Sequence, residues 1–417
     1  MKRIVFFLCL LYSWTIPAQN LTEKNSALLM DIFSKGSDAF FNVISQPEKY
    51  KYQIIYTQIN RNKHGFADLD RHYFNYDESQ FLYPASLVKL PLSVLALQKI
   101  NDLRFHSVLP FTTMVTDSGW YCETRVSSDF TQKNHMPSIE GYIKKMMLVS
   151  DNDAYNRVYE FLGYDYIYES LKKRGLPDVR ITQRFAGICD SLSYYTTNPV
   201  YFLNGTDTLY KQAGSLARYR LHNPLGEVFM GKGYYDFNHY FNPFPRSFYY
   251  NNFIKMDDLE SVIERIFFPE SFPKAQRFDV PEFYMDLLKK YMGQYPRESR
   301  YPEYALPDHF KKYFMIGDGR MKPANSDLRI FNVVGRAYGV LADCAYITDQ
   351  KSGTEFFLTA IMYCNEDDIL NDDSYEYDSV GLPFLAELGT LIYNYERSRE
   401  KKYKPDLKGL YQLLDSH

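Results

Sequence analysis

The sequence predicts an α/β protein in which one antiparallel sheet is flanked by helices and stands beside a large helical lobe. Alternating apolar residues occur near both ends of the chain, helical apolar spacing dominates its middle, and a final helical stretch closes it. Terminal strands of this kind meet in a single sheet, while the segment between them forms a second lobe. A cleft between two such lobes is the usual place for a binding site.

The N-terminal third begins with a helix and a pair of strands. Residues 25–41 have helical apolar spacing, and residues 52–58 and 66–76 then alternate between apolar and polar side chains. We expect these two segments to pair as antiparallel strands joined at residues 60–63. A further amphipathic helix is predicted from about Ser86 to Asn101.

The rest of the chain changes from helices to strands and back to a helix. We expect helices at 139–147, 153–162, 262–268, 283–292 and, at the end, 383–399. Long strands are expected at 338–348 and 354–364, on either side of a turn at 350–353. No internal repeat is evident.

These elements divide the chain into four parts. Residues 1–18 read as a signal peptide, 19–84 as the N-terminal helix and strands of the α/β lobe, 85–325 as the helical lobe with a long insertion at about 200–325, and 326–417 as the strands and helix that complete the α/β lobe. The signal consists of Lys2 and Arg3, an apolar run, and Ile16-Pro17-Ala18 before Gln19. We therefore expect a periplasmic or secreted protein.

Composition excludes several classes of function. With 417 residues and a formal net charge of -3, the chain has no global electrostatic reason to bind nucleic acid. No later stretch reaches the roughly 18 apolar residues of a membrane span, so no stable membrane insertion is expected. The eight His show no metal-ligand spacing, and neither a metal nor another cofactor is predicted. Cys122, Cys189, Cys344 and Cys364 fix no disulfide pairing, and the sequence leaves the oligomeric state open.

The strongest local signal is an S-x-x-K motif, Ser86-Leu87-Val88-Lys89, at the start of an amphipathic helix. Positions i and i+3 share a helix face, so the Lys89 amine can reach the Ser86 hydroxyl. A serine becomes a good nucleophile when a neighbouring base takes its proton, and burial makes a lysine neutral enough to act as that base. The plain alternative is an ordinary helix start with a solvated lysine.

A second motif, Ser150-Asp151-Asn152, follows 64 residues after Ser86 and opens another helix. Taken alone it reads as a helix N-cap, because Ser, Asp and Asn all favour that position. Its combination with S-x-x-K makes a catalytic role the better interpretation.

The two motifs together resemble the first two motifs of class A β-lactamases and related penicillin-binding proteins. The order of helices and strands after Asn152 is similar too, with about 85–190 and 328–400 matching and about 200–325 longer than in that family. The resemblance implies an acyl-enzyme mechanism. Ser86 would attack a carbonyl with Lys89 as its base or proton relay, Ser150 would pass the proton to the leaving nitrogen, and Asn152 would bind the amide side chain of the substrate.

The third motif of the family, K-[ST]-G, is altered. Lys351-Ser352-Gly353 matches it literally, but these residues fall between two predicted strands, where Ser-Gly favours a turn. The better register places Val333-Val334-Gly335 in the motif position, so that a valine replaces the lysine. Gly335 and Arg336 are then the substrate-binding residues expected on this strand. The backbone N–H of Arg336 would complete the oxyanion hole with that of Ser86, while strand alternation turns the Arg336 side chain to the other face.

The deacylation machinery of class A β-lactamases is also altered. That family uses a glutamate in E-x-x-L-N on a loop after the second motif, and the corresponding stretch here, Arg184 to Pro199, contains no Glu. Its single acid is Asp190, which is one methylene shorter and reads better as a loop cap than as a general base.

The sequence therefore predicts an exported serine hydrolase that forms an acyl-enzyme with an amide, ester or β-lactam, with weak β-lactam turnover. The expected substrate is a small-molecule or peptidoglycan-like acyl compound. The alternative is a catalytically impaired binding protein that keeps the cleft after losing the third-motif lysine. A covalent adduct on Ser86 would separate the two hypotheses.

Overall fold

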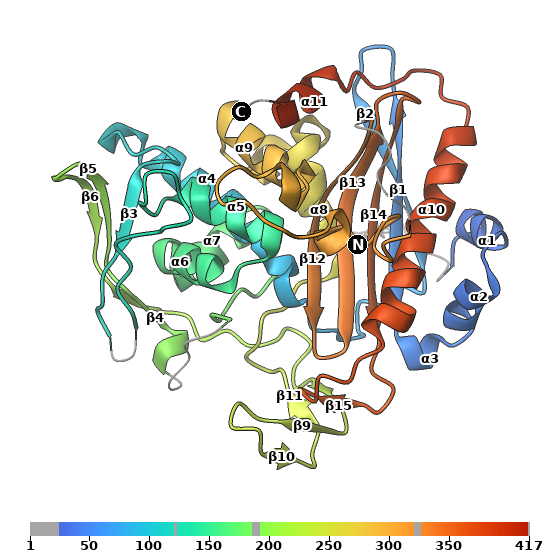
Figure 1. Cartoon of the computed structure of the whole chain (residues 1–417), viewed down its shortest axis with the longest axis horizontal. Coiled ribbons are helices and arrows are strands. Elements are labelled where there is room, and N and C mark those ends of the chain that lie inside the picture. Colours follow the sequence, from blue (N-terminus) through green and yellow to red (C-terminus); the bar gives the residue numbers. More distant parts are fainter. Residues whose placement is uncertain (1–24, 121–122, 186–191, 321–326, 416–417) are drawn as a thin grey trace, which may run out of the picture.

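The computed structural model of the chain describes residues 25–120, 123–185, 192–320 and 327–415 (Figure 1). The predicted signal peptide at 1–18, Cys122, Cys189 and Asp190 lie outside these residues. Within them the expected fold class is confirmed: an antiparallel sheet has helices on both faces, and a largely helical lobe stands beside it.

The central sheet has five strands in the order β12-β13-β14-β1-β2, and every neighbouring pair is antiparallel. Its strands come from both ends of the chain: β1 (Gln53–Arg61), β2 (Ala67–Phe74), β12 (Leu328–Ala337), β13 (Val340–Asp349) and β14 (Thr354–Tyr363). The hairpin predicted near the N-terminus is confirmed, although β1 extends through Arg61 and the turn follows it. The middle strands β13 and β14 are buried along their whole length because both faces are covered by helices.

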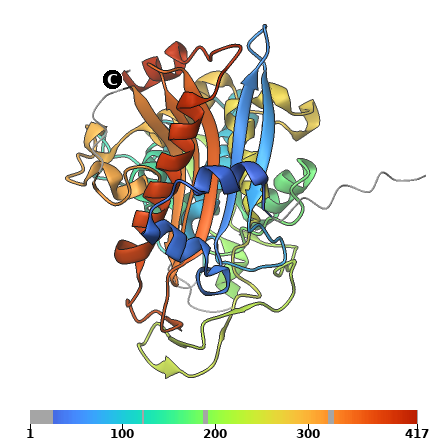
Figure 2. The ribbon, with the colours of Figure 1, turned by 90° about the vertical axis from the view of Figure 1, so that its right-hand side faces the viewer.

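Two apolar cores lie on opposite faces of the sheet, and strand alternation assigns residues to them. In β1, Ile55 and Ile59 point into the core under the helical lobe, whereas Ile54 and Tyr56 point into the core under the terminal helices. The second core is covered by α1 (Ala27–Phe33), α2 (Asp38–Ile44), α3 (Pro47–Tyr50) and α10 (Leu382–Ser398), which Figure 2 shows in front of the sheet.

The prediction of helical structure over residues 25–41 is confirmed, but the prediction of a single helix is wrong, because the chain forms two short helices there. The turn between α1 and α2 contains Gly36, where a Cβ atom would stand 2.7 Å from the Phe40 ring. Ser37 then caps α2 by accepting a hydrogen bond from the Phe40 N–H at 3.2 Å.

The other face of the sheet carries the lobe that holds the two motifs. Its helices are α4 (Lys89–Asp102), α5 (Ile139–Val149), α6 (Asn152–Leu162), α7 (Tyr164–Lys173), α8 (Met256–Phe267) and α9 (Glu282–Gly293). The helix expected at 262–268 is longer than predicted, and both α8 and α9 pack directly on the sheet as well as on α4. A short C-terminal helix, α11 (Lys408–Asp415), packs against α9.

Residues 196–247 of the long insertion form small strands rather than helices. These are β4 (Thr196–Thr197), β5 (Val200–Asn204), β6 (Asp207–Gln212), β7 (Ser215–Leu216), β8 (Phe229–Met230), β9 (Gly233–Tyr235), β10 (Phe241–Asn242) and β11 (Arg246–Ser247), with β3 (Thr113–Thr116) pairing with β5 and β15 (Ile369–Leu370) with β9. In Figure 1 the strands β9, β10, β11 and β15 lie together below the central sheet, at the end where β12 turns into β13.

Candidate active site

Ser86 lies in a short 3-10 turn, η1 (Ala85–Val88), that leads directly into α4. Strand β12 passes against this turn at Gly335, where a Cβ atom would stand 2.6 Å from the carbonyl oxygen of Pro84 and 3.1 Å from Leu87 Cγ. Only glycine allows this approach. The predicted register is therefore the observed one: Gly335 faces the segment of Ser86, and Val333 on the same strand face is 5% exposed in the core beneath it.

Three residues around the site have a left-handed backbone although none is glycine. These are Ala85 (φ 49°), Ser150 (φ 55°) and Tyr338 (φ 54°). Each such conformation costs about 1–3 kcal/mol and persists only where the surrounding structure enforces it. Ala85 directly precedes Ser86, so the strain lies where it fixes the direction of the serine side chain.

Lys89 connects the two motifs. Its amine lies 2.9 Å from Ser86 Oγ, 2.9 Å from Ser150 Oγ, 2.7 Å from Asn152 Oδ1 and 2.5 Å from the carbonyl oxygen of Ser150. All four oxygens are uncharged, and the Lys89 side chain is fully buried. The ring of Phe185, centred 5.0 Å from Nζ, lies beside the amine.

The environment of Lys89 favours the neutral amine. Burial lowers the pKa of Lys89 well below its ordinary value, the positive charge of Lys311 lowers it further, and only Asp151 acts in the opposite direction. A neutral amine has two hydrogens and one lone pair. The Ser150 carbonyl and the Asn152 amide oxygen are pure acceptors, so they take the two hydrogens. The lone pair then remains for the proton of a serine hydroxyl.

The second motif serves as a helix cap and as part of the site. Ser150 ends α5 in its left-handed conformation, and Asp151 is the N-cap of α6, since its carboxylate accepts a hydrogen bond from the Ala154 N–H at 2.8 Å. This sharp boundary between two helices turns the Ser150 hydroxyl and the Asn152 amide toward Lys89. The capping interpretation thus applies to Asp151, and the catalytic one remains available for its two neighbours.

The literal third-motif match lies away from this cluster. Lys351 is exposed in the turn between β13 and β14, where its backbone N–H donates to Asp349. A different cation, Lys311, which sequence reasoning missed, acts on Lys89 instead. It ends the short turn η7 (Asp308–Lys311), and the Asn332 side chain donates to its carbonyl oxygen at 2.9 Å. The backbone of Lys311 is thereby attached to β12 beside Val333, which occupies the position of the third-motif lysine.

The segment that holds Lys311 is fixed by its buried neighbour. The Lys312 amine donates to Ile330 O and Asn332 Oδ1, both at 2.7 Å. Burial, and to a smaller extent the charge of Arg336, lowers the pKa of Lys311 to about 8. No local motif marks Lys311 in the sequence, because only the long-range hydrogen bonds between residues 311–312 and β12 bring it to the site.

A cleft of 1710 Å³ opens beside Ser86. Asn152, Arg336 and Tyr338 line it together with the nucleophile. As the sequence predicts, alternation along β12 turns the Arg336 side chain to the other face of the strand. There its guanidinium carbon lies 4.5 Å from the centre of the Tyr377 ring. Because the strand ends at Ala337, Arg336 still reaches the rim of the cleft.

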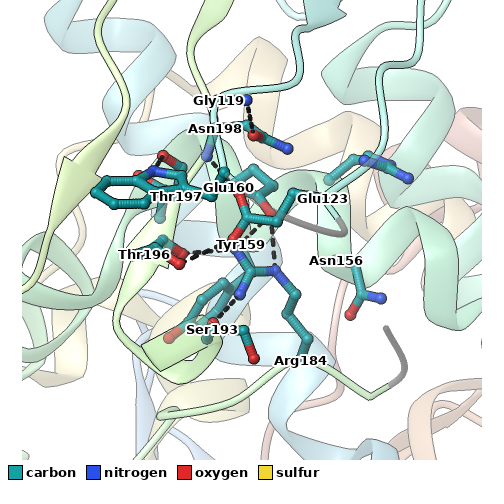
Figure 3. A network of polar contacts seen from close by, with 12 residues as sticks. Gly119, Glu123, Asn156, Tyr159, Glu160, Arg184, Ser193, Thr196, Thr197 and Asn198 are labelled. Atoms are coloured by element: carbon teal, nitrogen blue, oxygen red, sulfur yellow. Dashed lines mark hydrogen bonds and ion pairs between the residues drawn. The ribbon is translucent and has the colours of Figure 1, made fainter. Parts of the chain in front are cut away.

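Buried ion pairs hold both ends of the segment that corresponds to the deacylation loop (Figure 3). Arg184 pairs with Glu160 at 2.5 Å and with Glu123 at 3.0 Å, and it also donates to the carbonyl oxygens of Ser193 and Thr196. The Asn198 N–H donates to Glu160 at 2.5 Å. One arginine and one glutamate thus fix the beginning and the end of this segment, while Asp190 lies outside the described residues.

The described part of the chain was also compared with the side-chain arrangements of metal sites and disulfides. Within it, no group of His, Cys, Asp or Glu residues has the arrangement of a metal site, and Cys344 and Cys364 are buried free thiols. None of the helices among these residues is long and apolar enough to cross a membrane.

A match to a family model agrees with the resemblance described above. Residues 38–208 match the model of the beta-lactamase enzyme family, and no curated protein matches the chain. Among solved structures, a β-lactamase from Sphaerobacter thermophilus is 12% identical, covers 87% of this chain and 98% of its own, and has a TM-score of 0.47.

Two further solved structures have similar values. A class A β-lactamase from Bacteroides cellulosilyticus is 12% identical with 87% and 98% coverage and a TM-score of 0.45. A PBP-A mutant, an acyl-enzyme complex with penicillin G, is 12% identical with 88% and 96% coverage and a TM-score of 0.47. Over residues 38–208, which hold Ser86, Lys89, Ser150 and Asn152, the chain is therefore similar to the beta-lactamase enzyme family, as the motifs predict.

Proposed function

We propose that the protein is a serine hydrolase that forms an acyl-enzyme on Ser86 with an amide, ester or β-lactam and releases it slowly. The observation that carries this proposal is the position of the Lys89 amine, 2.9 Å from both Ser86 Oγ and Ser150 Oγ in a buried site that favours its neutral form. A helix cap alone requires no such convergence of a lysine and two hydroxyls from different helices.

In the first step the Ser86 oxygen attacks the substrate carbonyl carbon, and Lys89 takes the hydroxyl proton. The carbonyl oxygen becomes an oxyanion, which the backbone N–H groups of Ser86 and Arg336 would stabilise. Lys89 then gives a proton to Ser150, whose own proton passes to the leaving group as the carbonyl–leaving-group bond breaks. Asn152, which lines the cleft, would bind the amide side chain of the substrate.

Release of the acyl group needs an activated water, and here the proposal departs from efficient β-lactamases. Residues 184–199 contain no glutamate that could act as the general base. Such a base contributes about 10²–10⁴ in rate, so its loss leaves a long-lived acyl-enzyme. We also propose export to the periplasm or beyond, because the N-terminal pattern at 1–18 is typical of a signal peptide.

Intact-protein mass spectrometry after incubation with benzylpenicillin tests the proposal. The expected result is a mass increase of one penicillin molecule in the wild type and none in Ser86→Ala. Saturable binding without an adduct would instead support the alternative, a catalytically impaired binding protein. That alternative is based on the valine at position 333, where the family has a lysine. A matched Ser93→Ala variant on α4, whose hydroxyl donates to the Lys89 carbonyl oxygen, should still form the adduct.

A further inference from the structure

The long insertion carries an uncharged segment at one end of the molecule. Residues 237–245, which we call the aromatic tip, contain no Asp, Glu, Lys or Arg. The tip follows β9, includes β10 and leads into β11. Figure 1 and Figure 2 both show this part of the chain at the same end of the molecule, beyond the central sheet and the helical lobe. A partner that approaches this end therefore meets the aromatic tip.

Four aromatic side chains of the tip are exposed. The exposed fractions are 90% for Phe237, 73% for Tyr240, 50% for Phe241 and 69% for Phe244. Phe241 packs on Tyr235 with ring centres 5.4 Å apart, whereas the other three rings stack against no aromatic ring or cation among the described residues. Exposed apolar side chains that gather in one place mark an interaction surface, because their hydration is unfavourable.

The backbone of the tip forms hydrogen bonds within its own loop. The Asp236 carboxylate accepts from the N–H groups of Asn238 and Tyr240, both at 2.9 Å, and the Asp236 N–H donates to the Tyr240 carbonyl oxygen at 3.0 Å. The His239 N–H donates to the Asp236 carbonyl oxygen at 3.0 Å, and the two prolines of the tip have no N–H. A backbone whose polar groups are already paired tolerates a poorly hydrated environment.

The apolar area of the tip is small for a protein interface. The exposed parts of the four rings amount to roughly 400–700 Å², since one aromatic side chain has about 150–250 Å². A stable interface with a second copy of the chain or another protein needs about 800 Å² on each side and a complementary shape. A lipid bilayer requires neither, because binding there increases with whatever apolar area is inserted.

The charges next to the tip favour a partner without net charge. Strand β15, which pairs with β9, is flanked by four acidic residues, namely Asp367, Asp368, Asp372 and Asp373. The basic residues within 231–247 are Lys232 and Arg246. Anionic lipids attract basic surfaces and are repelled by acidic ones, whereas a zwitterionic lipid surface carries no net charge. The surroundings of the tip therefore match a zwitterionic bilayer.

We propose that the aromatic tip docks on a zwitterionic lipid bilayer, with Phe237, Tyr240 and Phe244 inserted at the membrane–water interface. Aromatic side chains favour this depth, because their rings are apolar and the tyrosine hydroxyl remains among the polar headgroups. The contact is peripheral and needs no membrane-spanning helix. Phe237 also lines the cleft that holds Ser86, so docking brings this cleft close to the membrane surface. The proposal concerns the insertion and does not depend on the hydrolase function.

Flotation with phosphatidylcholine vesicles tests the proposal. The protein is the chain from Gln19, which keeps every described residue and lacks the apolar run of the predicted signal peptide. We expect half-saturation at about 1 mM lipid or below. Phe237→Ser combined with Phe244→Ser should weaken binding roughly 100-fold, because burial of one phenylalanine side chain is worth at least about 10-fold in an equilibrium constant. Phosphatidylglycerol mixed into the vesicles should not strengthen binding, because acidic residues lie beside the tip.

Phe105→Ser combined with Phe130→Ser is the matched control, because these two phenylalanines of the helical lobe are 84% and 80% exposed. The control pair should bind vesicles as the wild type does, and unaltered thermal melting should verify that each variant is folded. No flotation of the wild type, flotation that survives the two tip substitutions, an equal loss in the control pair, or tighter binding with phosphatidylglycerol would overturn the proposal. A dimer in sedimentation equilibrium that the tip substitutions dissociate, without vesicle binding, would assign the tip to a second copy of the chain instead.

Discussion

The side-chain oxygen of Asn152 lies 2.7 Å from the amine of Lys89 and takes one of the two hydrogens of its neutral form. Acylation requires this neutral form, so its rate should rise with pH through the pKa of Lys89. Asn152→Asp places a negative charge at the same point, which raises that pKa. We expect the rise in the pH–rate profile to move to higher pH and acylation at pH 7 to fall about 10–100-fold.

Asn152→Ala is the control for this prediction, because it removes the acceptor without adding a charge. Its profile should keep a rise at lower pH than that of Asn152→Asp. Stopped-flow acylation by a chromogenic β-lactam between pH 5 and 9 provides the measurement. Identical profiles for the two variants would mean that Lys89 is not the base.

Lys311 supplies positive charge where the third-motif lysine is missing. In Lys311→Met the pKa of Lys89 should increase, because a neighbouring positive charge no longer opposes its protonation. Acylation by an anionic substrate should slow by about 10–10² at pH 7, since one fixed charge near the reacting group is lost. The difference should shrink above pH 8, because wild-type Lys311 itself loses its charge there.

Lys351→Met provides the comparison, since Lys351 belongs to the literal K-S-G match but lies exposed in a hairpin turn. Its acylation rate should equal that of the wild type. A slow Lys351→Met variant together with a normal Lys311→Met variant would reverse the assignment of the two lysines.

The acyl-enzyme should accumulate. Burst kinetics with penicillin should show one rapid turnover per Ser86, followed by a steady state slower than the burst by at least about 10², because no general base activates the water. Quenched-flow mass spectrometry would follow both phases. A linear time course with no accumulated adduct would mean that a base outside the described residues, such as Asp190, acts efficiently.

Local sequence was sufficient for the parts of the site that depend on helical or strand periodicity. The i, i+3 spacing places Lys89 beside Ser86, and the order of strand, turn, strand and helix at the C-terminus places Gly335 rather than Lys351 at the nucleophile. The hairpin of β1 and β2 and the final helix follow from the same periodicity.

Residues brought in by long-range packing could not be predicted in this way. Lys311 approaches Lys89 because residues 311–312 are hydrogen-bonded to β12, and Arg246 reaches the cleft next to Phe248, which packs against Tyr83 and Tyr338. Neither residue belongs to a periodic pattern or a motif. Six of the eight small strands at residues 196–247 have only two or three residues, and segments of this length are too short to show alternation.

Stability should depend on pH through Glu260, which is buried beneath the sheet and accepts a hydrogen bond from Thr57. Burial, with a smaller contribution from the charge of Glu264, raises its pKa to about 8. The folded state therefore keeps a proton that the unfolded chain releases above about pH 4.5. Its contribution to stability is present at low pH and is lost as the pH rises toward 8.

In Glu260→Gln the free energy of unfolding should fall less between pH 5 and 8 than it does in the wild type. The difference between the two decreases should be on the order of a few kcal/mol. Urea unfolding at pH 5, 6.5 and 8 measures the effect. The exposed Glu282→Gln variant should follow the wild type. A Glu260→Gln profile as steep as that of the wild type would assign the dependence to another buried acid.

Gly335 offers a test of how closely β12 must approach the nucleophile. A Cβ atom at this position would lie 2.6 Å from the backbone oxygen of Pro84, which cannot move without displacing Ala85 and Ser86. Gly335→Ala should therefore push the strand and the serine turn apart. Overpacking of this kind costs about 1–3 kcal/mol, and acylation should fall further because the Arg336 N–H leaves the oxyanion position.

Gly409→Ala in α11 is the matched substitution, because nothing lies within 4 Å of its added methyl group and alanine favours a helix more than glycine does. It should leave acylation unchanged and keep or raise the melting temperature. Thermal melting and the rate of Ser86 acylation, measured on both variants, separate the two effects. If Gly335→Ala melted lower but acylated at the wild-type rate, the contact would be structural only, and the oxyanion role of β12 at Arg336 would be wrong.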